Sequence, residues 1–325
     1  MRPFAYERAE DAASAVALID EHTRFLAGGT NLVDLMKLGV ETPERLVDVS
    51  RLPYAEVEPL SDGGVRIGAG VRNSDAATHP LVRERAPLLA EALLAGASGQ
   101  LRNRATVGGN LLQRTRCSYF QDVTKPCNKR APGTGCPAVE GEHRNLAVLG
   151  HSTACVATHP SDMAVALAAL GALVAVTGPG GDRVVAMPGL HRLPGDEPQR
   201  DTVLEPGDLI TGVDVAPLGA AAVTRYRKVR DRASYAFAVV SVAAAAEQAP
   251  NGTLADVRLA LGGVAHVPWR AERAEAVLRG ARPDERTLRA AADAELERAR
   301  PLRDNAFKVD LARALIVATL QEVTR

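Results

Sequence analysis

The first part of the chain alternates between short apolar runs and apolar positions at helical spacing. Residues 25–27 form an apolar run that ends at the turn sequence GGTN (28–31). Apolar residues then recur at helical spacing over 32–38, the pattern stops at Gly39, and a second strand-like run covers 45–49. A continuous short run indicates a strand and a period near 3.6 indicates a helix, so this segment predicts a strand–turn–helix–strand unit.

The GGTN turn has the chemistry of an anion-binding loop. Glycine lets the backbone turn its N–H groups toward a ligand, and the helix that follows adds a partial positive charge at its N-terminus. A phosphate or pyrophosphate is therefore the expected guest. The sequence lacks the GxGxxG pattern of dinucleotide folds, so a tight glycine turn with an Asn cap stays open as the alternative.

The middle of the chain continues the succession of apolar strands and polar loops. The elements predicted there are a strand at 65–71, a helix cap at 73–75, a helix at 79–98, a second Gly-Gly-Asn loop within 102–113, a helix at 163–171 capped by 160–162, and a strand at 172–178. Each loop by itself could be scaffold, but three polar loops between apolar strands are able to line one long groove.

The last third of the chain predicts a separate unit. Residues 179–220 are rich in Pro, Gly and charged residues, which indicates surface hairpins and a boundary. The elements expected beyond it are strands within 223–247 and 255–271, separated by a turn at Asn251-Gly252, and helices at 271–280, 285–299 and 304–324. Strands followed by helices predict an α+β unit.

Composition and charge limit the classes of partner. The 325 residues are 46% hydrophobic and 24% charged, with 39 basic and 39 acidic residues. This balance does not favour nucleic acid or an anionic membrane surface, so we expect no nucleic acid and no membrane span. The apolar runs at 163–178 and 236–246 are Ala-rich, short for a bilayer span, and predict buried core. Charged residues interrupt the first 22 positions, so we expect synthesis and assembly in the cytoplasm, with export to the periplasm only alongside a signal-bearing partner.

All four cysteines fall in one Gly/Pro-rich stretch that also contains Lys125, Lys129 and Arg130. They are Cys117, Cys127, Cys136 and Cys155, with the spacing C-x9-C-x8-C-x18-C. The absence of a CxxC pair disfavours a zinc ribbon, and a chain of this size without an export signal has little need of disulfides. Four thiolates in a flexible loop beside cations suit a [4Fe-4S] cluster. The spacing alone leaves the cluster, zinc and disulfides open.

Five motifs, taken in order, resemble one family. FLAGGTNLVDLMK, RNRATVGGNLLQ, CVATHPSDMAVAL, LEPGDLITGV and YRKVRDRASYAFAVVSVA are similar to motifs of the flavin-binding subunit of the molybdenum hydroxylases, the xanthine dehydrogenase and aldehyde oxidoreductase family. The cysteine segment most closely resembles that of the flavin subunit of bacterial periplasmic aldehyde oxidoreductase, which carries a [4Fe-4S] cluster besides FAD.

The resemblance implies both a fold and partners. The fold is α+β: an FAD-binding domain of the vanillyl-alcohol-oxidase (PCMH) type, followed by an α+β domain of the CO dehydrogenase flavoprotein type. We expect the first domain at 1–220, with subdomains at about 1–52 and 53–220 and a cluster-binding insertion at 114–158, and the second at 221–325. A molybdopterin-binding large subunit would oxidise the substrate, a [2Fe-2S] small subunit would relay electrons, and this chain would pass them to an external acceptor.

The resemblance also implies roles for particular residues, none of them catalytic. Backbone groups of one stretch would hold the FAD pyrophosphate: Leu26, Ala27, Gly28, Gly29, Thr30, Asn31, Leu32 and Val33. A second stretch would lie along the isoalloxazine and the phosphates: Thr106, Gly108, Gly109 and Asn110. The remaining contacts would be Ser161 and Asp162 to the ribityl or pyrophosphate region, Ile210 to the flavin or adenine, and Lys228 to the flavin. The four cysteines would ligate the cluster. Asp162 could instead be a plain helix cap, and Lys228 a solvated charge at a strand edge.

Other functions stay open at this point. A standalone FAD oxidase of the same fold would need a substrate constellation, and the C-terminal unit offers only Trp269 and His266. The flavin subunit of another molybdenum hydroxylase, of the xanthine dehydrogenase or benzoyl-CoA reductase type, is a second alternative. The short insertion favours the aldehyde oxidoreductase branch over the benzoyl-CoA reductase type. A non-redox scaffold with structural zinc is the third.

Overall fold

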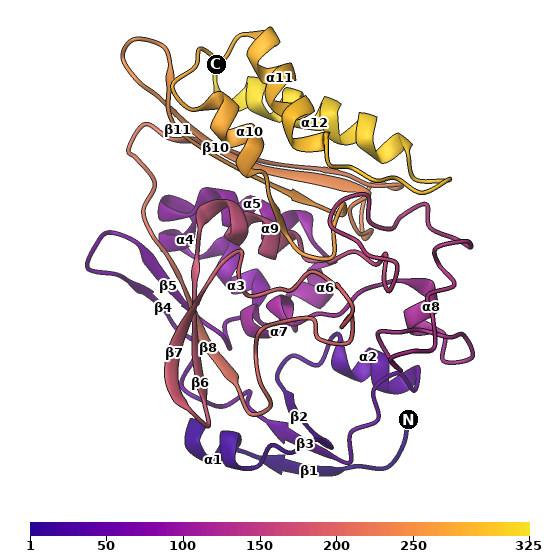
Figure 1. Cartoon of the computed structure of the whole chain (residues 1–325). Helices are drawn as coiled ribbons and strands as arrows, with labels where there is room; N and C mark the ends of the chain where they lie inside the picture. Colours follow the sequence, from indigo (N-terminus) through magenta and orange to yellow (C-terminus); the bar gives the residue numbers. More distant parts are fainter.

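The computed structural model describes all residues from Met1 to Arg325 and contains three β-sheets (Figure 1). The N-terminal unit is a three-stranded parallel sheet with the strand order β1-β3-β2. Its elements are β1 (Ala5–Arg8), α1 (Ala12–Ala17), β2 (Thr23–Leu26), α2 (Leu32–Lys37) and β3 (Arg45–Asp48). The predicted strand–turn–helix–strand unit is confirmed. Parallel strands need a crossover connection, and α2 supplies it between β2 and β3.

The second unit is a five-stranded antiparallel sheet with the order β4-β5-β8-β6-β7, accompanied by seven helices. Its elements are β4 (Val57–Pro59), β5 (Val65–Gly68), α3 (Asn73–Thr78), α4 (Pro80–Arg85), α5 (Pro87–Ala95), α6 (Gly99–Arg102), α7 (Val107–Leu111), α8 (Ser118–Gln121), α9 (Asp162–Leu170), β6 (Leu173–Gly178), β7 (Gly181–Ala186) and β8 (Leu209–Val215). β8 is the central strand of this sheet. The expectation of surface hairpins and a boundary over 179–220 is therefore wrong for residues 209–215.

Two helical expectations need correction. The helix predicted over 79–98 is divided into α4 and α5 at Ala86. Pro87 causes this division, because proline lacks an N–H donor and disfavours helical geometry in the residue before it. Residues 73–75 form the first turn of α3, whose cap position is Arg72 without a side-chain hydrogen bond.

The buried helix α9 forms as predicted. The Ser161 hydroxyl accepts a hydrogen bond from the Ala164 amide at 3.0 Å at its start, and Gly171 ends it with φ of 65°. All nine residues of α9 are buried, which no exposed amphipathic helix would allow. This helix therefore forms the centre of the molecule.

The C-terminal unit is an antiparallel sheet with the order β12-β11-β10-β9, followed by three helices. Its elements are β9 (Val223–Val229), β10 (Val240–Gln248), β11 (Leu254–Gly262), β12 (Trp269–Arg270), α10 (Glu272–Leu278), α11 (Glu285–Leu296) and α12 (Phe307–Val323). The helices cover one face of this sheet, and α5 and α9 of the second unit contact the other face (Figure 1).

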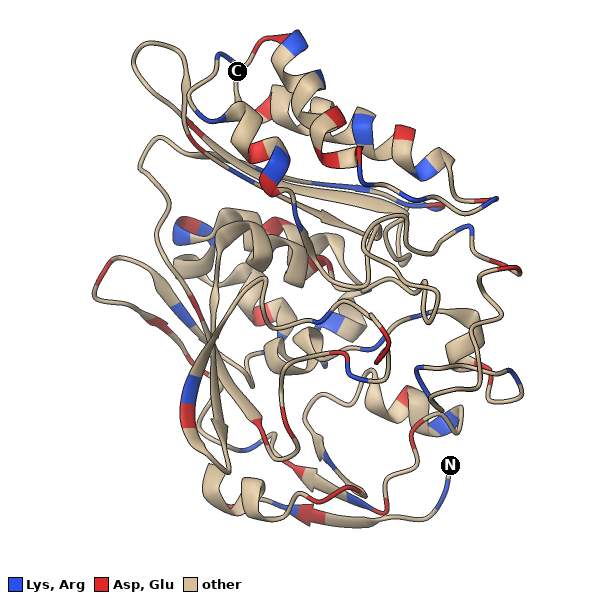
Figure 2. Cartoon of the chain, viewed as in Figure 1, with Lys and Arg blue, Asp and Glu red and all other residues tan.

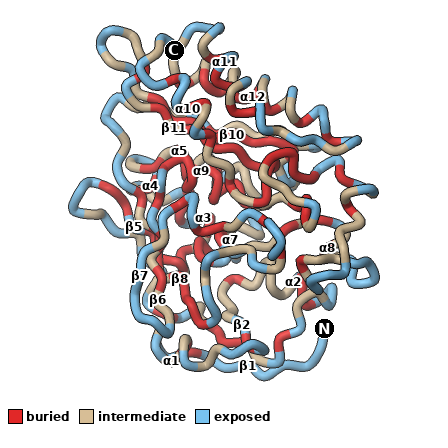
Figure 3. The backbone as a smooth tube through the Cα atoms, viewed as in Figure 1, coloured by how far each residue is buried: buried red, intermediate tan, exposed pale blue.

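Strand β10 belongs to two hydrophobic cores at once. Ala243 packs in the core around α9, whereas Val242 and Ala244 pack in the core beneath α10–α12. Successive side chains of a strand point to opposite faces, so a strand buried on both faces is almost entirely apolar, and Ser241 is the one polar residue in the buried part of β10. The short alanine side chains let both helical layers come close, and the deepest burial lies along β10, β11 and α9 (Figure 3). The prediction that the Ala-rich runs are core is confirmed for residues 163–170 and 239–246, whereas Leu173 and Phe237 in the remaining parts of the two runs are exposed.

Charged residues of both signs are interspersed over the outer elements (Figure 2). Their balance agrees with the net charge of zero. None of the helices combines the length and the apolar character needed to cross a bilayer.

Candidate functional site

A cavity of about 310 Å³ lies between the N-terminal sheet and the second unit. The GGTN turn forms one of its sides, the segment around α7 a second, and the start of β8 a third. The predicted cofactor residues that line it are Ala27, Gly28, Gly29, Thr30, Asn31, Leu32, Thr106, Gly108, Gly109 and Ile210. Leu26 and Val33 flank the turn without lining the cavity. The structure thus brings together two loops that are about 75 residues apart in the sequence.

Close backbone contact explains the glycines at this place. A Cβ atom on Gly28 would lie 2.4 Å from the Arg104 carbonyl oxygen, which no side chain could tolerate. Gly29 has φ of 75°, a left-handed conformation that side-chain-bearing residues rarely adopt. The Arg104 side chain donates a hydrogen bond from Nε to the Gly28 carbonyl oxygen at 3.1 Å. The two loops are therefore held together by backbone contacts that only glycine permits.

The turn presents free hydrogen-bond donors to the cavity. The backbone amides of Gly28, Gly29, Thr30 and Asn31 donate to no protein acceptor. The side-chain amide nitrogen of Asn31 is buried and likewise has no partner. Gly28 is buried and residues 29–31 are half-buried, so consecutive amides without a protein partner in the wall of a cavity indicate a site for an anionic ligand such as a pyrophosphate. These residues fit the phosphates of FAD.

The second predicted loop is a helical turn. Thr106 caps α7, and its hydroxyl accepts a hydrogen bond from the Gly109 amide at 3.3 Å. The Gly108 amide donates to the Ala69 carbonyl at 2.9 Å, so it is not free for a ligand. A Cβ on Gly108 would lie 3.0 Å from the Ala69 side chain, which explains this glycine by packing.

A second cavity of about 350 Å³ continues from the first. The two cavities share Thr30, Asn31 and Gly109 in their walls, so the expected long groove is present. Asn110 and Asp162 line this second part. Ser161 lies behind them, where its hydroxyl donates to the Asn110 side chain at 2.6 Å. Of the predicted residues beyond the GGTN turn, Asn110, Ser161 and Asp162 thus lie around the second cavity.

Several residues of the groove were not singled out from the sequence. Tyr54 and Arg72 line the first cavity, and Asn73, Tyr235 and Phe237 line the second. Tyr235 and Phe237 belong to the motif YRKVRDRASYAFAVVSVA, so the aromatic residues of that motif were an available signal. Asn73 was interpreted as a helix cap, and its buried side-chain oxygen has no partner.

Lys228 is not a solvated charge at a strand edge. Its side chain is 4% exposed and forms an ion pair with Asp162 at 2.7 Å. Asp162 follows the cap residue of α9, so it is not the cap itself, and it also accepts a hydrogen bond from the Tyr226 hydroxyl at 2.6 Å. Burial and the adjacent Asp162 carboxylate raise the pKa of Tyr226 well above its usual range, which keeps the hydroxyl protonated as a donor. Lys228 therefore acts on the groove through Asp162, whose charge it balances.

The four cysteines line one small cavity of about 10 Å³ in the insertion around α8. All four are free, and Cys117 and Cys155 are buried, so no disulfide forms. Burial raises the pKa of Cys155 to about 12, while the nearby Lys129 ammonium acts in the opposite direction. No group of three or more His, Cys, Asp or Glu side chains has the geometry to hold a metal ion in this structure.

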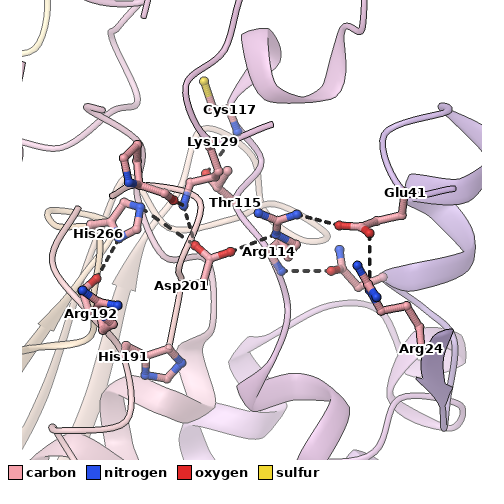
Figure 4. A network of polar contacts seen from close by, with 12 residues as sticks. Arg24, Glu41, Arg114, Thr115, Cys117, Lys129, His191, Arg192, Asp201 and His266 are labelled. Carbon is pink, nitrogen blue, oxygen red and sulfur yellow. Dashed lines mark hydrogen bonds and ion pairs between the residues drawn. The ribbon is translucent and has the colours of Figure 1, made fainter. Parts of the chain in front are cut away.

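A network of charged side chains, with Lys129 buried and most others half-buried, lies between the cysteine cavity and the groove (Figure 4). Lys129 is paired with Asp201, and Asp201 accepts a hydrogen bond from Arg114 Nε at 2.8 Å. Arg114 also contacts Glu41 at 2.5 Å, and Glu41 lies 3.8 Å from Arg24. Burial favours the neutral form of Asp201, but the two adjacent cations outweigh it and hold the pKa of this carboxyl well below its usual range.

Three buried histidines adjoin this network. His266 donates from Nδ1 to the Arg192 carbonyl oxygen at 3.0 Å, and the rings of His159 and His191 lie with centroids 4.2 Å apart. Burial lowers the pKa of all three, and burial together with the Lys129 charge lowers the pKa of His266 to about 4. These side chains are therefore neutral at physiological pH.

Comparison with known proteins identifies the family. The family described as the FAD binding domain in molybdopterin dehydrogenase matches residues 2–217, and the one described as the CO dehydrogenase flavoprotein C-terminal domain matches residues 224–323. The chain belongs to this family of flavoprotein subunits. The resemblance inferred from the five motifs is confirmed, as is the α+β fold with an FAD-binding domain followed by a CO dehydrogenase flavoprotein domain.

Individual relatives span the whole flavoprotein subunit. The aldehyde oxidoreductase FAD-binding subunit PaoB of Escherichia coli (strain K12) is 50% identical, over 99% of this chain and 98% of the relative. The carbon monoxide dehydrogenase medium chain of Hydrogenophaga pseudoflava is 28% identical over 93% of this chain and 88% of the relative. A solved structure, reconstituted CO dehydrogenase from Oligotropha carboxidovorans, has a TM-score of 0.79 at 24% identity, covering 100% and 99% of the chains, a likeness of fold. The chain is a subunit of an oxidoreductase.

The buried histidines predict that this flavoprotein subunit loses stability below about pH 6.5. Their pKa values are lower in the folded chain than in the unfolded chain, so the unfolded chain binds more protons between pH 6.5 and the folded pKa, which is about 4 for His266. Stability is therefore full above the unfolded pKa and falls on acidification, by up to about 1.4 kcal/mol per pH unit for each histidine. Urea unfolding at about pH 7.5 and about pH 5.5 measures this change. In His266→Gln the free energy of unfolding should fall less per pH unit than in wild type. A free energy of unfolding that stays constant or rises on acidification would contradict the prediction.

Proposed function

We propose that this chain is the FAD-carrying subunit of a heterotrimeric molybdenum-containing aldehyde oxidoreductase. In that role it accepts electrons from a [2Fe-2S] small subunit and passes them to an external acceptor, while a molybdopterin-binding large subunit oxidises the aldehyde. The observation that carries the proposal is the groove lined by the unpaired amides of the GGTN turn. The 50% identity to an aldehyde oxidoreductase subunit over the whole chain supports the choice of substrate class.

Different residues of the groove would contact different parts of FAD. The amides of residues 28–31 would bind the pyrophosphate, and the apolar wall at Ile210 would pack on the flavin or adenine. Asn110 and Asp162 would meet the ribityl region in the second cavity. Bound there, FAD would supply the chemistry of a two-electron carrier that also exchanges single electrons.

The C-terminal unit supports an electron-transfer subunit over a standalone oxidase. His266 is 3% exposed and bonded to a backbone carbonyl. The indole N–H of Trp269 donates to Glu295 at 2.8 Å, and neither side chain lines the groove. Substrate chemistry would therefore belong to another subunit.

The same proposal assigns a [4Fe-4S] cluster to Cys117, Cys127, Cys136 and Cys155. All four thiols line one cavity, and the Lys129 ammonium beside them would offset part of the negative charge of the ligated cluster. The insertion contains a single four-residue helix, and seven of its residues form a small hydrophobic cluster with Leu35 of α2. Metal ligation can supply folding energy that such a segment lacks, so a bracing role fits this cluster.

Gly29→Val tests the pyrophosphate assignment. A branched side chain at φ of 75° is strained and would contact the Val33 and Leu26 side chains at 3.1 and 3.3 Å, so we expect the GGTN turn to shift and the flavin content to fall about tenfold. Flavin per chain is measured by absorbance after denaturation, which should release all of it because binding is noncovalent. Gly180→Val, at a position with open space around it, is the control. Full flavin content in Gly29→Val would refute the assignment.

Because the proposal assigns aldehyde oxidation to the molybdopterin-binding subunit, we expect that the FAD-loaded chain alone does not oxidise aldehydes. Aldehyde-dependent reduction of an artificial dye should require the molybdopterin-binding and [2Fe-2S] subunits, because no substrate constellation faces the groove. Steady-state assays of the chain alone and of the reconstituted complex measure this. Robust turnover by the chain alone would favour the standalone oxidase.

The cluster predicts a stoichiometry that each cysteine controls. In Cys127→Ser we expect iron and acid-labile sulfide well under about four per chain, because a [4Fe-4S] cluster uses four cysteine ligands. Hydrogen exchange should increase over residues 114–140. Ser118→Ala, an exposed residue in the same insertion, is the control. One tightly bound zinc per wild-type chain, without sulfide, would refute the cluster.

A further inference from the structure

Arg114 contacts both candidate cofactor sites. Its side chain lines the groove, and its guanidinium stacks on the Phe120 ring at 4.7 Å from the ring centroid. Phe120 is fully buried and lines the cysteine cavity. The backbone amide of Arg114 donates to the Asn31 side chain at 2.9 Å, and Asn31 belongs to the GGTN turn. One residue thus joins the turn that presents free amides to the wall of the cysteine cavity.

Asp201 connects Arg114 to a second residue of the cysteine insertion. One carboxylate oxygen accepts from Arg114 Nε at 2.8 Å, and the other pairs with the Lys129 ammonium (Figure 4). The Lys129 side chain is 1% exposed, lines the cysteine cavity and also donates to the Pro198 carbonyl at 2.7 Å. Asp201 comes from the segment before β8, outside the insertion. Both cations are therefore paired with one carboxylate that lies outside the insertion.

The charges of this bridge balance only as a set. Lys129 and Arg114 are positive, and Asp201 and Glu41 are negative, so the four sum to zero. Lys129 is buried and the other three are half-buried, so removing one partner leaves a poorly solvated charge without compensation, which is more costly than removing an exposed pair. If the insertion loses order, Lys129 leaves Asp201 and Arg114 must rearrange with it. The position of Asn31 in the GGTN turn would change in consequence.

We infer that Asp201 is a positioning residue that couples the cysteine cavity to the groove, so that ordering of the insertion by its cluster strengthens FAD binding. The inference rests on the proposed function, which places FAD in the groove and the cluster on the cysteines. Coupling between two sites is reciprocal in binding free energy, so bound FAD must also strengthen binding of the cluster. The coupling acts through the Lys129–Asp201–Arg114 contacts and not through direct contact between the two ligands.

FAD titration of the full chain tests the coupling. For wild type, the FAD dissociation constant should rise roughly tenfold when a chelator and reductant remove the iron. For Asp201→Asn, FAD binding should already be weak with the iron present, and removal of the iron should change it little. Asp293→Asn, which breaks the exposed Arg313–Asp293 pair of 2.7 Å in the C-terminal unit, is the matched control and should respond as wild type does. Bound FAD should also raise the chelator concentration that removes half of the iron at equilibrium in wild type but not in Asp201→Asn.

A structural role alone would not make FAD affinity depend on the iron content. Should Asp201→Asn fail to fold, Lys129→Met removes the other partner of the Lys129–Asp201 pair and allows the same titration. The comparison of iron-loaded with iron-free wild type needs no variant. Equal dissociation constants for iron-loaded and iron-free wild type would overturn the coupling while FAD and cluster assignments stand. A wild-type chain that never binds iron would overturn the cluster assignment and the coupling with it.

Discussion

The contact between the backbones of Gly28 and Arg104 is the constraint on which the groove depends. A Cβ at residue 28 would lie 2.4 Å from the Arg104 carbonyl, so only glycine allows the N-terminal sheet to pack this closely on the second unit. The contact holds the GGTN turn in a position where its amides face a cavity and not a protein acceptor. Amides without a partner would be costly in a closed core, whereas in the wall of an open groove they are available to a ligand.

The alanine-rich strand β10 fixes the other end of the groove. Its two buried faces hold the C-terminal helices on one side and α9 on the other, and Asp162 begins α9. The adjacent strand β9 supplies Tyr226 and Lys228, which both contact the Asp162 carboxylate. A carboxylate at the groove is therefore oriented by the packing of the C-terminal unit. The C-terminal unit thus orients Asp162, and Tyr235 and Phe237 in the loop after β9 form part of the wall of the second cavity.

The cysteine insertion depends on different forces. It has one short helix, and its core is shared: Leu35 of α2 packs with its buried residues, and Val148 and Leu149 pack in the C-terminal core. Charged pairs add to this packing, because the buried Lys129 and the half-buried Arg114 both contact Asp201, and removal of one partner leaves a charge without compensation. The insertion is therefore joined to the flavoprotein core by apolar packing and by charged pairs together.

The sequence by itself determined the local features. Glycine turns, the Ser161 cap, the buried alanine-rich strands and the proximity of the four cysteines follow from turn chemistry, periodicity and spacing, which act over a few residues. Pro87 carried a local signal for the break between α4 and α5 that the apolar pattern concealed. The central place of β8, the pairing of Lys228 with Asp162 and the bridge through Asp201 were decided only by the tertiary structure. Partners in these pairs are 66 and 72 residues apart in sequence, and a charge finds its partner by burial and distance, which no short-range pattern records.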